Sequence, residues 1–276
     1  MEKNKGRLAL SLVVCLIGLV PLVIVSRIVK GMDNDLLIAL LETIARAGAA
    51  FAIIFYVKKA YKIKIGIKKD ALLKGVFWHG LTAMIFCAAM LVFNYEAPER
   101  SVLGALPILL YYALVNFCIG MFEEALCRGL LFNSFKAFFG DNKKGVYLSS
   151  FLSAFLFGAL HLGNLNGNNT LATLTQVIYA TFFGIFFAAI YYRTGNLLAC
   201  MIIHGAVDYV DIFWHCFKKD RMAAKLAEQA TDSSIGESIV ALAVTSVFLI
   251  SALLQLRKVF KVRGAAPGET RVLQEA

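Results

Sequence analysis

The sequence has few charged residues and few helix breakers. Only 17% of the 276 residues are charged and only four are proline, whereas 59% are hydrophobic. The mean hydropathy is +0.72. So little polar surface cannot cover a water-soluble globule of this length. Hydrophobic runs fill nearly the whole chain and leave no room for a separate soluble domain. We therefore predict a single integral membrane domain.

The chain also lacks paired cysteines. Its six cysteines lie in apolar stretches and include no C-x-x-C pair. Buried thiols behave as small hydrophobic side chains, so the spacing indicates neither a disulfide framework nor a zinc finger.

The excess of positive charge has a simple explanation in a membrane protein. The net charge is +10, and the basic run 58–69 has only Tyr61 as an aromatic neighbour. Basic loops of this kind are attracted to an anionic lipid leaflet, and a nucleic-acid site would be richer in aromatic residues. We predict the lipid bilayer as a partner and no nucleic acid.

About eight membrane-spanning helices are expected, because roughly 20 apolar residues are needed to cross a bilayer. The predicted spans are 8–26, 36–57, 75–94, one helix within 102–139, 146–162, 171–192, 197–217 and 235–256. The stretch 102–139 should hold a helix from about residue 105 and then a short interfacial piece at 132–139. The fold class is all-α, with N-terminal helices in 1–100, a core of helices four to seven in 101–217, and a loop, last helix and tail in 218–276.

The distribution of Lys and Arg predicts the orientation. Lys3, Lys5 and Arg7 precede the first apolar run, which resembles a secretory signal. That run is too long for a signal core and no small-x-small site closes it, so we expect a retained anchor. Most remaining Lys and Arg fall in loops on the same side as the N-terminus, which predicts that both termini are cytoplasmic.

Three apolar stretches carry ionisable residues that hydrocarbon should exclude. Charged groups at bilayer depth cost several kcal/mol, so such residues indicate a functional site. The first stretch holds two adjacent glutamates and an arginine, and each of the other two holds a histidine: Glu123, Glu124 and Arg128; Phe157 and His161; His204 and Asp208.

The two glutamates are expected to have different tasks. Adjacent residues of a helix point about 100° apart, so only one of them can face a central cavity. Glu124 lies four residues before Arg128, which favours an ion pair along one helix face. Glu123 is then left free, and a carboxylate in a poorly solvated cavity can serve as a general base.

Histidines on two further helices complete the arrangement. Glu123 and His161 could orient and deprotonate a water molecule, while His204 and Asp208 could bind a substrate carbonyl or the oxyanion formed on attack. Asp208 could donate to an oxyanion only when protonated, so we expect it to orient His204 or a neighbouring helix.

These residues resemble the CPBP or ABI family of intramembrane proteases, which includes the type II CAAX prenyl endopeptidases and bacteriocin-processing proteins. The family pattern is Glu-Glu-x-x-x-Arg, Phe-x-x-x-His and His-x-x-x-Asn or Asp on successive helices, and all three motifs occur here in order between about 102 and 217. The resemblance implies peptide-bond hydrolysis at the membrane, with Glu123 as general base with His161, and His204 and Asp208 at the oxyanion site. Asn is more familiar at the position of Asp208. The resemblance also implies a bacterial inner membrane, the commonest setting for family members of this size.

A metal ion is an open question at this point. Members of the family are also described as metalloproteases, and Glu123, His161 and His204 could form a zinc site with an open position for water. The sequence has no His-Glu-x-x-His helix, however, so we favour hydrolysis by water that Glu and His activate without a metal.

Other functions fit the sequence less well. An aspartyl dyad would need Asp on two helices, and a rhomboid-like Gly-x-Ser nucleophile is absent around Ser149, Ser150 and Ser153. A second intramembrane pair, Glu42 and Arg46, is interpreted as structural. The main alternative is a non-catalytic bacteriocin-immunity or scaffold protein of the same fold, and a transporter with a buried proton relay is weaker.

Overall fold

The computed structural model describes residues 2–61, 69–165, 170–219 and 234–265, and within these ranges it contains helices and no strands. Parts of the loop between the predicted spans 36–57 and 75–94, most of the predicted loop after 217 and the tail beyond 265 lie outside the described residues. The α-helices are α1 (Glu2–Ile28), α2 (Asp35–Tyr61), α3 (Lys69–Leu73), α4 (Leu81–Phe93), α5 (Val102–Glu124), α6 (Asn133–Phe139), α7 (Lys143–Leu160), α8 (Thr170–Thr194), α9 (Leu197–Ile212) and α11 (Ile235–Ala265). π-Helical segments cover Lys74–His79 and Ala125–Phe132, and 3₁₀ turns cover His161–Asn164 and Trp214–Phe217.

The all-α polytopic membrane fold is confirmed, with a smaller number of full-length spans than expected. Among the described residues, six helical segments are long and apolar enough to cross a membrane, or seven if one bent pair counts as a span. The predicted span 197–217 is instead the 16-residue α9 followed by a 3₁₀ turn. With 16 residues, α9 is shorter than the roughly 20 helical residues that cross a bilayer.

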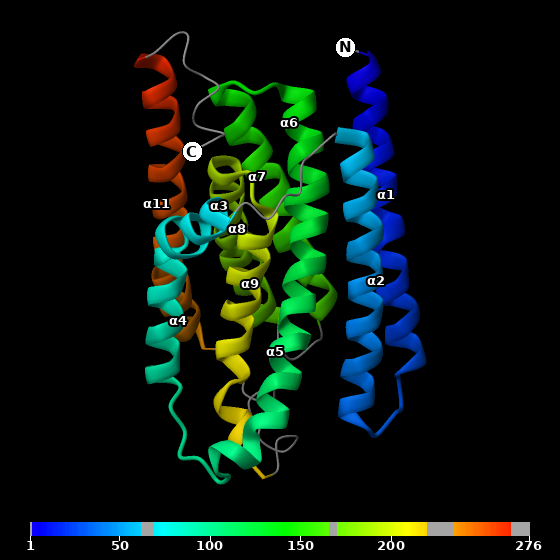
Figure 1. Ribbon diagram of the computed structural model, residues 1–276, viewed down its shortest axis with the longest axis vertical. Helices are drawn as coiled ribbons and strands as arrows, with labels where there is room; N and C mark the ends of the chain where they lie inside the picture. The colour runs from blue at the N-terminus through cyan, green and yellow to red at the C-terminus, as the bar shows by residue number, and fades with distance from the viewer. Residues whose placement is uncertain (1, 62–68, 166–169, 220–233, 266–276) are drawn as a thin grey trace.

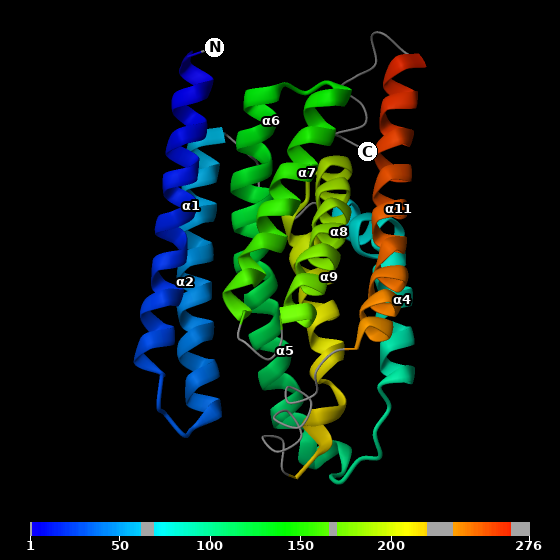
Figure 2. The same ribbon diagram turned by 180° about the vertical axis from the view of Figure 1, so that it is seen from behind.

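The helices form an elongated bundle with an outlying hairpin. Figures 1 and 2 show α1 and α2 side by side at one edge, α4 and α11 at the other, and α5 to α9 between them. The start of α1, the end of α2, α6 and the end of α11 lie at the same end of the bundle (Figure 1). This end carries Lys58 and Lys59 of α2 and Arg263 of α11, so these basic residues of two helix ends lie on one side of the bundle.

Two predicted elements need correction. The span 75–94 is broken: Lys69–His79 and Leu81–Phe93 meet at 57°, because Gly80 has φ −87° and ψ 1° and leaves the helical conformation. The prediction of a separate short piece at 132–139 is also wrong, whereas its position at the membrane interface stays a prediction. Val102–Phe139 is one continuous helical run of 38 residues.

The π-helical segment Ala125–Phe132 connects α5 to α6 within this long helical run. A π-helix widens the backbone and leaves carbonyl groups without their usual α-helical partners. The side-chain amide of Asn133 donates to the carbonyl oxygens of Arg128 and Gly129, both at 2.8 Å. Asn133 therefore satisfies the backbone where the π-helical segment returns to α-helix. Such segments are frequent at functional sites, and this one begins directly after Glu124.

Two glycines bring α5 and α9 into backbone contact. A Cβ atom on Gly120 would lie 2.9 Å from the backbone nitrogen of Gly205, and one on Gly205 would lie 2.9 Å from the Cα of Phe117. Neither position can carry a side chain without moving the helices apart. This close approach sets the distance between the glutamates at the end of α5 and the histidine of α9.

Candidate active site

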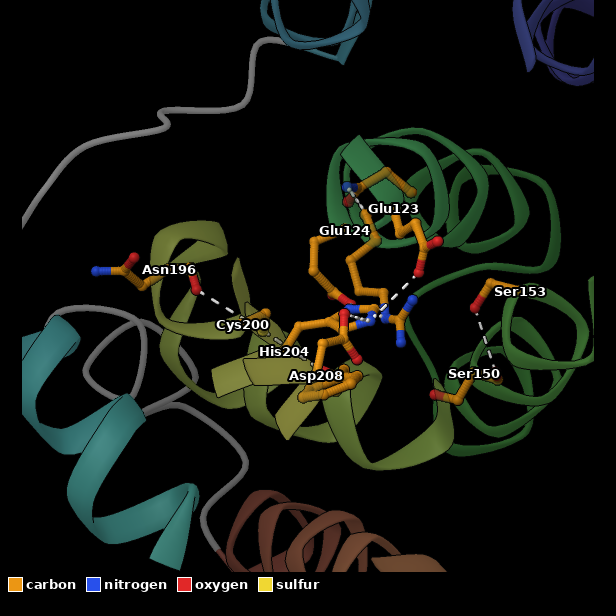
Figure 3. Close-up of polar contacts among 11 residues, drawn as sticks. Glu123, Glu124, Ser150, Ser153, Asn196, Cys200, His204 and Asp208 are labelled. Carbon is orange, nitrogen blue, oxygen red and sulfur yellow. Dashed lines mark hydrogen bonds and ion pairs between the residues drawn. The ribbon is translucent and has the colours of Figure 1, made fainter. Parts of the chain in front are cut away.

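The predicted site residues of α5 and α9 meet in the middle of the bundle. Glu123 and Glu124 end α5, and His204 and Asp208 lie one turn apart on α9. Figure 3 shows the side chains of these four residues converging between the two helices. Residues from two separate apolar stretches of the sequence therefore form one polar cluster.

The expected ion pair between Glu124 and Arg128 is present and fully buried. Arg128 Nε lies 3.1 Å from Glu124 Oε2, and the two side chains are 1% and 0% exposed. The other oxygen of Glu124 contacts His204 Nδ1 at 2.8 Å. Glu124 thus joins the arginine of its own helical run to the histidine of α9, a second contact that spacing along one helix cannot reveal.

The expectation that Glu123 is free is wrong. Its Oε2 lies 3.2 Å from His204 Nε2, so His204 lies between two glutamates. Both ring nitrogens can donate at once only in the protonated imidazolium. With His204 in that form, Arg128 and His204 supply two positive charges beside the carboxylates of Glu123 and Glu124. Asp208 Oδ2 lies further from the same ring nitrogen, at 3.6 Å.

The rings of two phenylalanines pack against Arg128 and His204. The Arg128 guanidinium carbon lies 4.9 Å from the ring centroid of Phe157 and 5.0 Å from that of Phe187. The His204 ring stacks on Phe187 with centroids 5.1 Å apart and an interplanar angle of 12°. Desolvated contacts of a cation with an aromatic face are worth about 2 kcal/mol each. Phe187 was not identified from the sequence, because it lies in a run of phenylalanines that core packing alone explains.

His161 approaches the cluster without joining its hydrogen bonds. It begins the 3₁₀ turn after α7, and its Nδ1 lies 3.2 Å from the carbonyl oxygen of Phe157. The Phe157 ring meets both histidines edge to face, with centroids 5.2 Å from His161 and 5.6 Å from His204. Among the described contacts, the histidine that meets Glu123 is His204 and not His161, so a joint action of Glu123 and His161 requires a molecule between them.

The side chains of the site differ in how far they are exposed to solvent. Glu124, Arg128 and His204 are at most 6% exposed, whereas Glu123 and Asp208 are 23% and 30% exposed. The three buried groups fix positions, and the two more exposed carboxylates are the ones that a substrate or water could meet. The geometry therefore offers Glu123 as an accessible base held against a buried histidine.

The side chains do not fit a zinc site formed by Glu123, His161 and His204. Both nitrogens of His204 lie against carboxylate oxygens, and one nitrogen of His161 lies against a backbone carbonyl. A histidine ligand needs a ring nitrogen whose lone pair points at the metal. Among the described residues, no group of three or more His, Cys, Asp or Glu side chains is arranged to hold a metal ion.

Comparison with known proteins identifies the core of the chain. Residues 103–210 match the family model described as type II CAAX prenyl endopeptidase Rce1-like. This range contains all six candidate residues and confirms the resemblance that their motifs indicated. No curated protein matches the chain significantly, and no solved structure does.

Proposed function

We infer, from a core that belongs to the Rce1-like family of type II CAAX prenyl endopeptidases over residues 103–210, that the protein is an intramembrane endopeptidase. It hydrolyses a peptide bond of a membrane-associated protein or peptide. The observation that carries this proposal is the partly exposed carboxylate of Glu123, 3.2 Å from a His204 that is itself anchored to buried Glu124. A base of this kind on the open side of a rigid polar cluster suits the activation of water.

Glu123 takes the proton of the attacking water. The hydroxide adds to the peptide carbonyl carbon and forms a tetrahedral oxyanion. As the carbon–nitrogen bond breaks, the carboxylic acid of Glu123 returns the proton to the leaving amine. The same group therefore acts first as general base and then as general acid, which returns the site to its starting state.

His204 and Asp208 form the oxyanion side of the site. While Glu123 is ionised, His204 Nε2 points at its carboxylate. Once Glu123 has taken a proton, this N–H can donate to the oxyanion instead, because the opposite nitrogen stays anchored on Glu124. Asp208 orients His204 from one turn away. His161 orients the water from the other side, through the ring nitrogen that does not contact Phe157.

The proposed mechanism needs no metal ion. It is supported by the nitrogens of His204, which are engaged by carboxylates rather than directed toward a shared point. We further propose that the protein lies in a bacterial inner membrane with both termini cytoplasmic. The basic helix ends that share one end of the bundle support this orientation.

The experiment is to reconstitute the purified protein in nanodiscs and incubate it with a quenched-fluorescent peptide library, identifying products by mass spectrometry. Peptide cleavage at a defined bond, unaffected by a zinc chelator, supports the proposal. Cleavage that the chelator abolishes would overturn the metal-free mechanism. No cleavage of any peptide, by protein of normal abundance and fold, would favour a scaffold or immunity role.

A further inference from the structure

Basic side chains from three helical segments gather at the break before α4, away from the cluster described above. Arg193 lies in the last turn of α8, Lys258 lies on α11, and Lys74 begins the π-helical segment that ends at the break. All three lie within Coulomb range of the His79 ring. Like charges repel one another, so this arrangement favours the binding of an anion between them.

Hydrogen bonds to backbone carbonyl groups hold the three elements together. The side-chain amide of Gln255 on α11 donates to the His79 carbonyl oxygen at 3.1 Å, and Arg193 Nη1 donates to the Gln255 carbonyl oxygen at 3.3 Å. One turn earlier on α11, the Ser251 hydroxyl accepts a hydrogen bond from Thr82 of α4 at 3.0 Å. The two cations of α8 and α11 are therefore brought together by contacts that leave their positive charge uncompensated.

No carboxylate balances this charge within the described part of the chain. The ion pairs there do not include Arg193 or Lys258. The bond to Gln255 engages one of the five N–H groups of the Arg193 guanidinium. Arg193 is partly exposed and Lys258 is exposed, so an anion from outside the protein can reach both.

The surroundings of the break favour an anion that belongs to the membrane. Phe77 and Trp78, which directly precede His79, are 62% and 71% exposed. Exposed aromatic side chains of this kind are typical of the level of the lipid headgroups. Figures 1 and 2 show α4 and α11 at the edge of the bundle, where lipid can approach them. Basic pockets between membrane helices at this level bind anionic headgroups.

We propose that Arg193 and Lys258 bind the phosphate of an anionic lipid headgroup at the break before α4. The remaining N–H groups of the Arg193 guanidinium bind two phosphate oxygens, and the Lys258 ammonium adds a point charge. Lys74 contributes positive charge from the third side. The inference goes beyond the proposed endopeptidase function and does not depend on it.

A headgroup bound here would act on the helix that carries His204. The π-helical segment before the break packs against α8 and α9. A Cβ atom on Gly80 would lie 2.6 Å from Cδ1 of Ile203, the residue before His204, so the break and α9 are in close contact. By joining α8 and α11 across the break, the headgroup would hold this contact in place.

Tryptophan fluorescence gives a direct test, because the chain has two tryptophans and one of them is Trp78. In Trp214→Phe protein, Trp78 is the sole tryptophan. In phosphatidylcholine nanodiscs, brominated phosphatidylglycerol should quench Trp78 half-maximally at a mole fraction about 5- to 25-fold lower than brominated phosphatidylcholine, since each cation contributes about fivefold. Arg193→Gln and Lys258→Gln should each reduce this preference about fivefold, and the double variant should abolish it.

Arg257→Gln is the matched control, because it removes one positive charge from the same helix. Arg257 is exposed and lies within Coulomb range of Tyr147 of α7, so its loss should leave the preference unchanged. An equal loss in Arg257→Gln and Lys258→Gln would indicate diffuse attraction to the leaflet and would overturn the proposal. Equal quenching of Trp78 by the two brominated lipids would overturn it as well.

A final comparison separates a lipid headgroup from free phosphate. Millimolar inorganic phosphate, added at constant ionic strength, should leave the preference for brominated phosphatidylglycerol unchanged. Loss of the preference on this addition would assign the cations to a soluble phosphate and overturn the lipid assignment. Each of these measurements reads binding alone, so its failure would leave the endopeptidase function intact.

Discussion

The buried pair of Glu124 and Arg128 gives the sharpest prediction of stability. Replacing Arg128 with Met keeps a long apolar side chain between the rings of Phe157 and Phe187 but leaves Glu124 as a buried charge opposite His204 alone. Removing one partner of a buried ion pair costs about 3–5 kcal/mol. At about 2–4 °C per kcal/mol for a chain of this size, the melting temperature should fall by about 6–20 °C.

Thermal unfolding of purified protein in nanodiscs measures this change. Arg27→Met, at an exposed position near the end of α1, is the matched control and should shift the free energy of unfolding by less than about 0.5 kcal/mol. The double variant Glu124→Gln/Arg128→Met removes both charges and should recover more than half of the loss. A melting temperature of Arg128→Met equal to that of the wild type would refute the role of the pair.

Substitutions at three further residues test the remaining parts of the site. Phe187→Leu removes the ring under His204 and should lower kcat about tenfold, since aromatic contacts of this kind are worth about 0.5–1.5 kcal/mol; Phe183→Leu, on the same helix, should lower stability with little change in kcat. Asp208→Asn should retain or raise kcat, because an amide can donate to the oxyanion, whereas Asp208→Ala should lower it; loss of activity in both would assign the carboxylate itself to the reaction. His161→Gln should lower kcat by about 10²-fold or more, because the ring orients the water. Steady-state kinetics should show this loss in kcat with KM unchanged, whereas weaker substrate binding would raise KM.

Local spacing allowed part of the site to be predicted from the sequence. The pair of Glu124 and Arg128 follows from four-residue spacing on one helix, and the structure contains it. The contact of Glu123 with His204 could not be predicted in this way. This contact depends on how closely α5 and α9 approach at Gly120 and Gly205. The spacing of residues within either helix does not predict the distance between the two helices.

The fold could be predicted from the sequence wherever an apolar run determines the position of a helix. Apolar runs gave the helices, including those of α2, α8 and α11. They did not reveal that Val102–Phe139 stays one helical run, because the π-helical segment is stabilised by the Asn133 side chain and by packing rather than by hydropathy. The break at Gly80 was also missed, since a single glycine within an apolar run is compatible with an unbroken helix.

Glu123 is the proposed base of the hydrolytic reaction. The most direct measurement is kcat of Glu123→Gln in nanodiscs, beside Glu237→Gln, which removes an exposed carboxylate at the start of α11. Glu123→Gln should lose about 10²- to 10⁴-fold in kcat at an unchanged melting temperature, while Glu237→Gln should keep the wild-type rate. Wild-type turnover by folded Glu123→Gln protein would exclude Glu123 as the base.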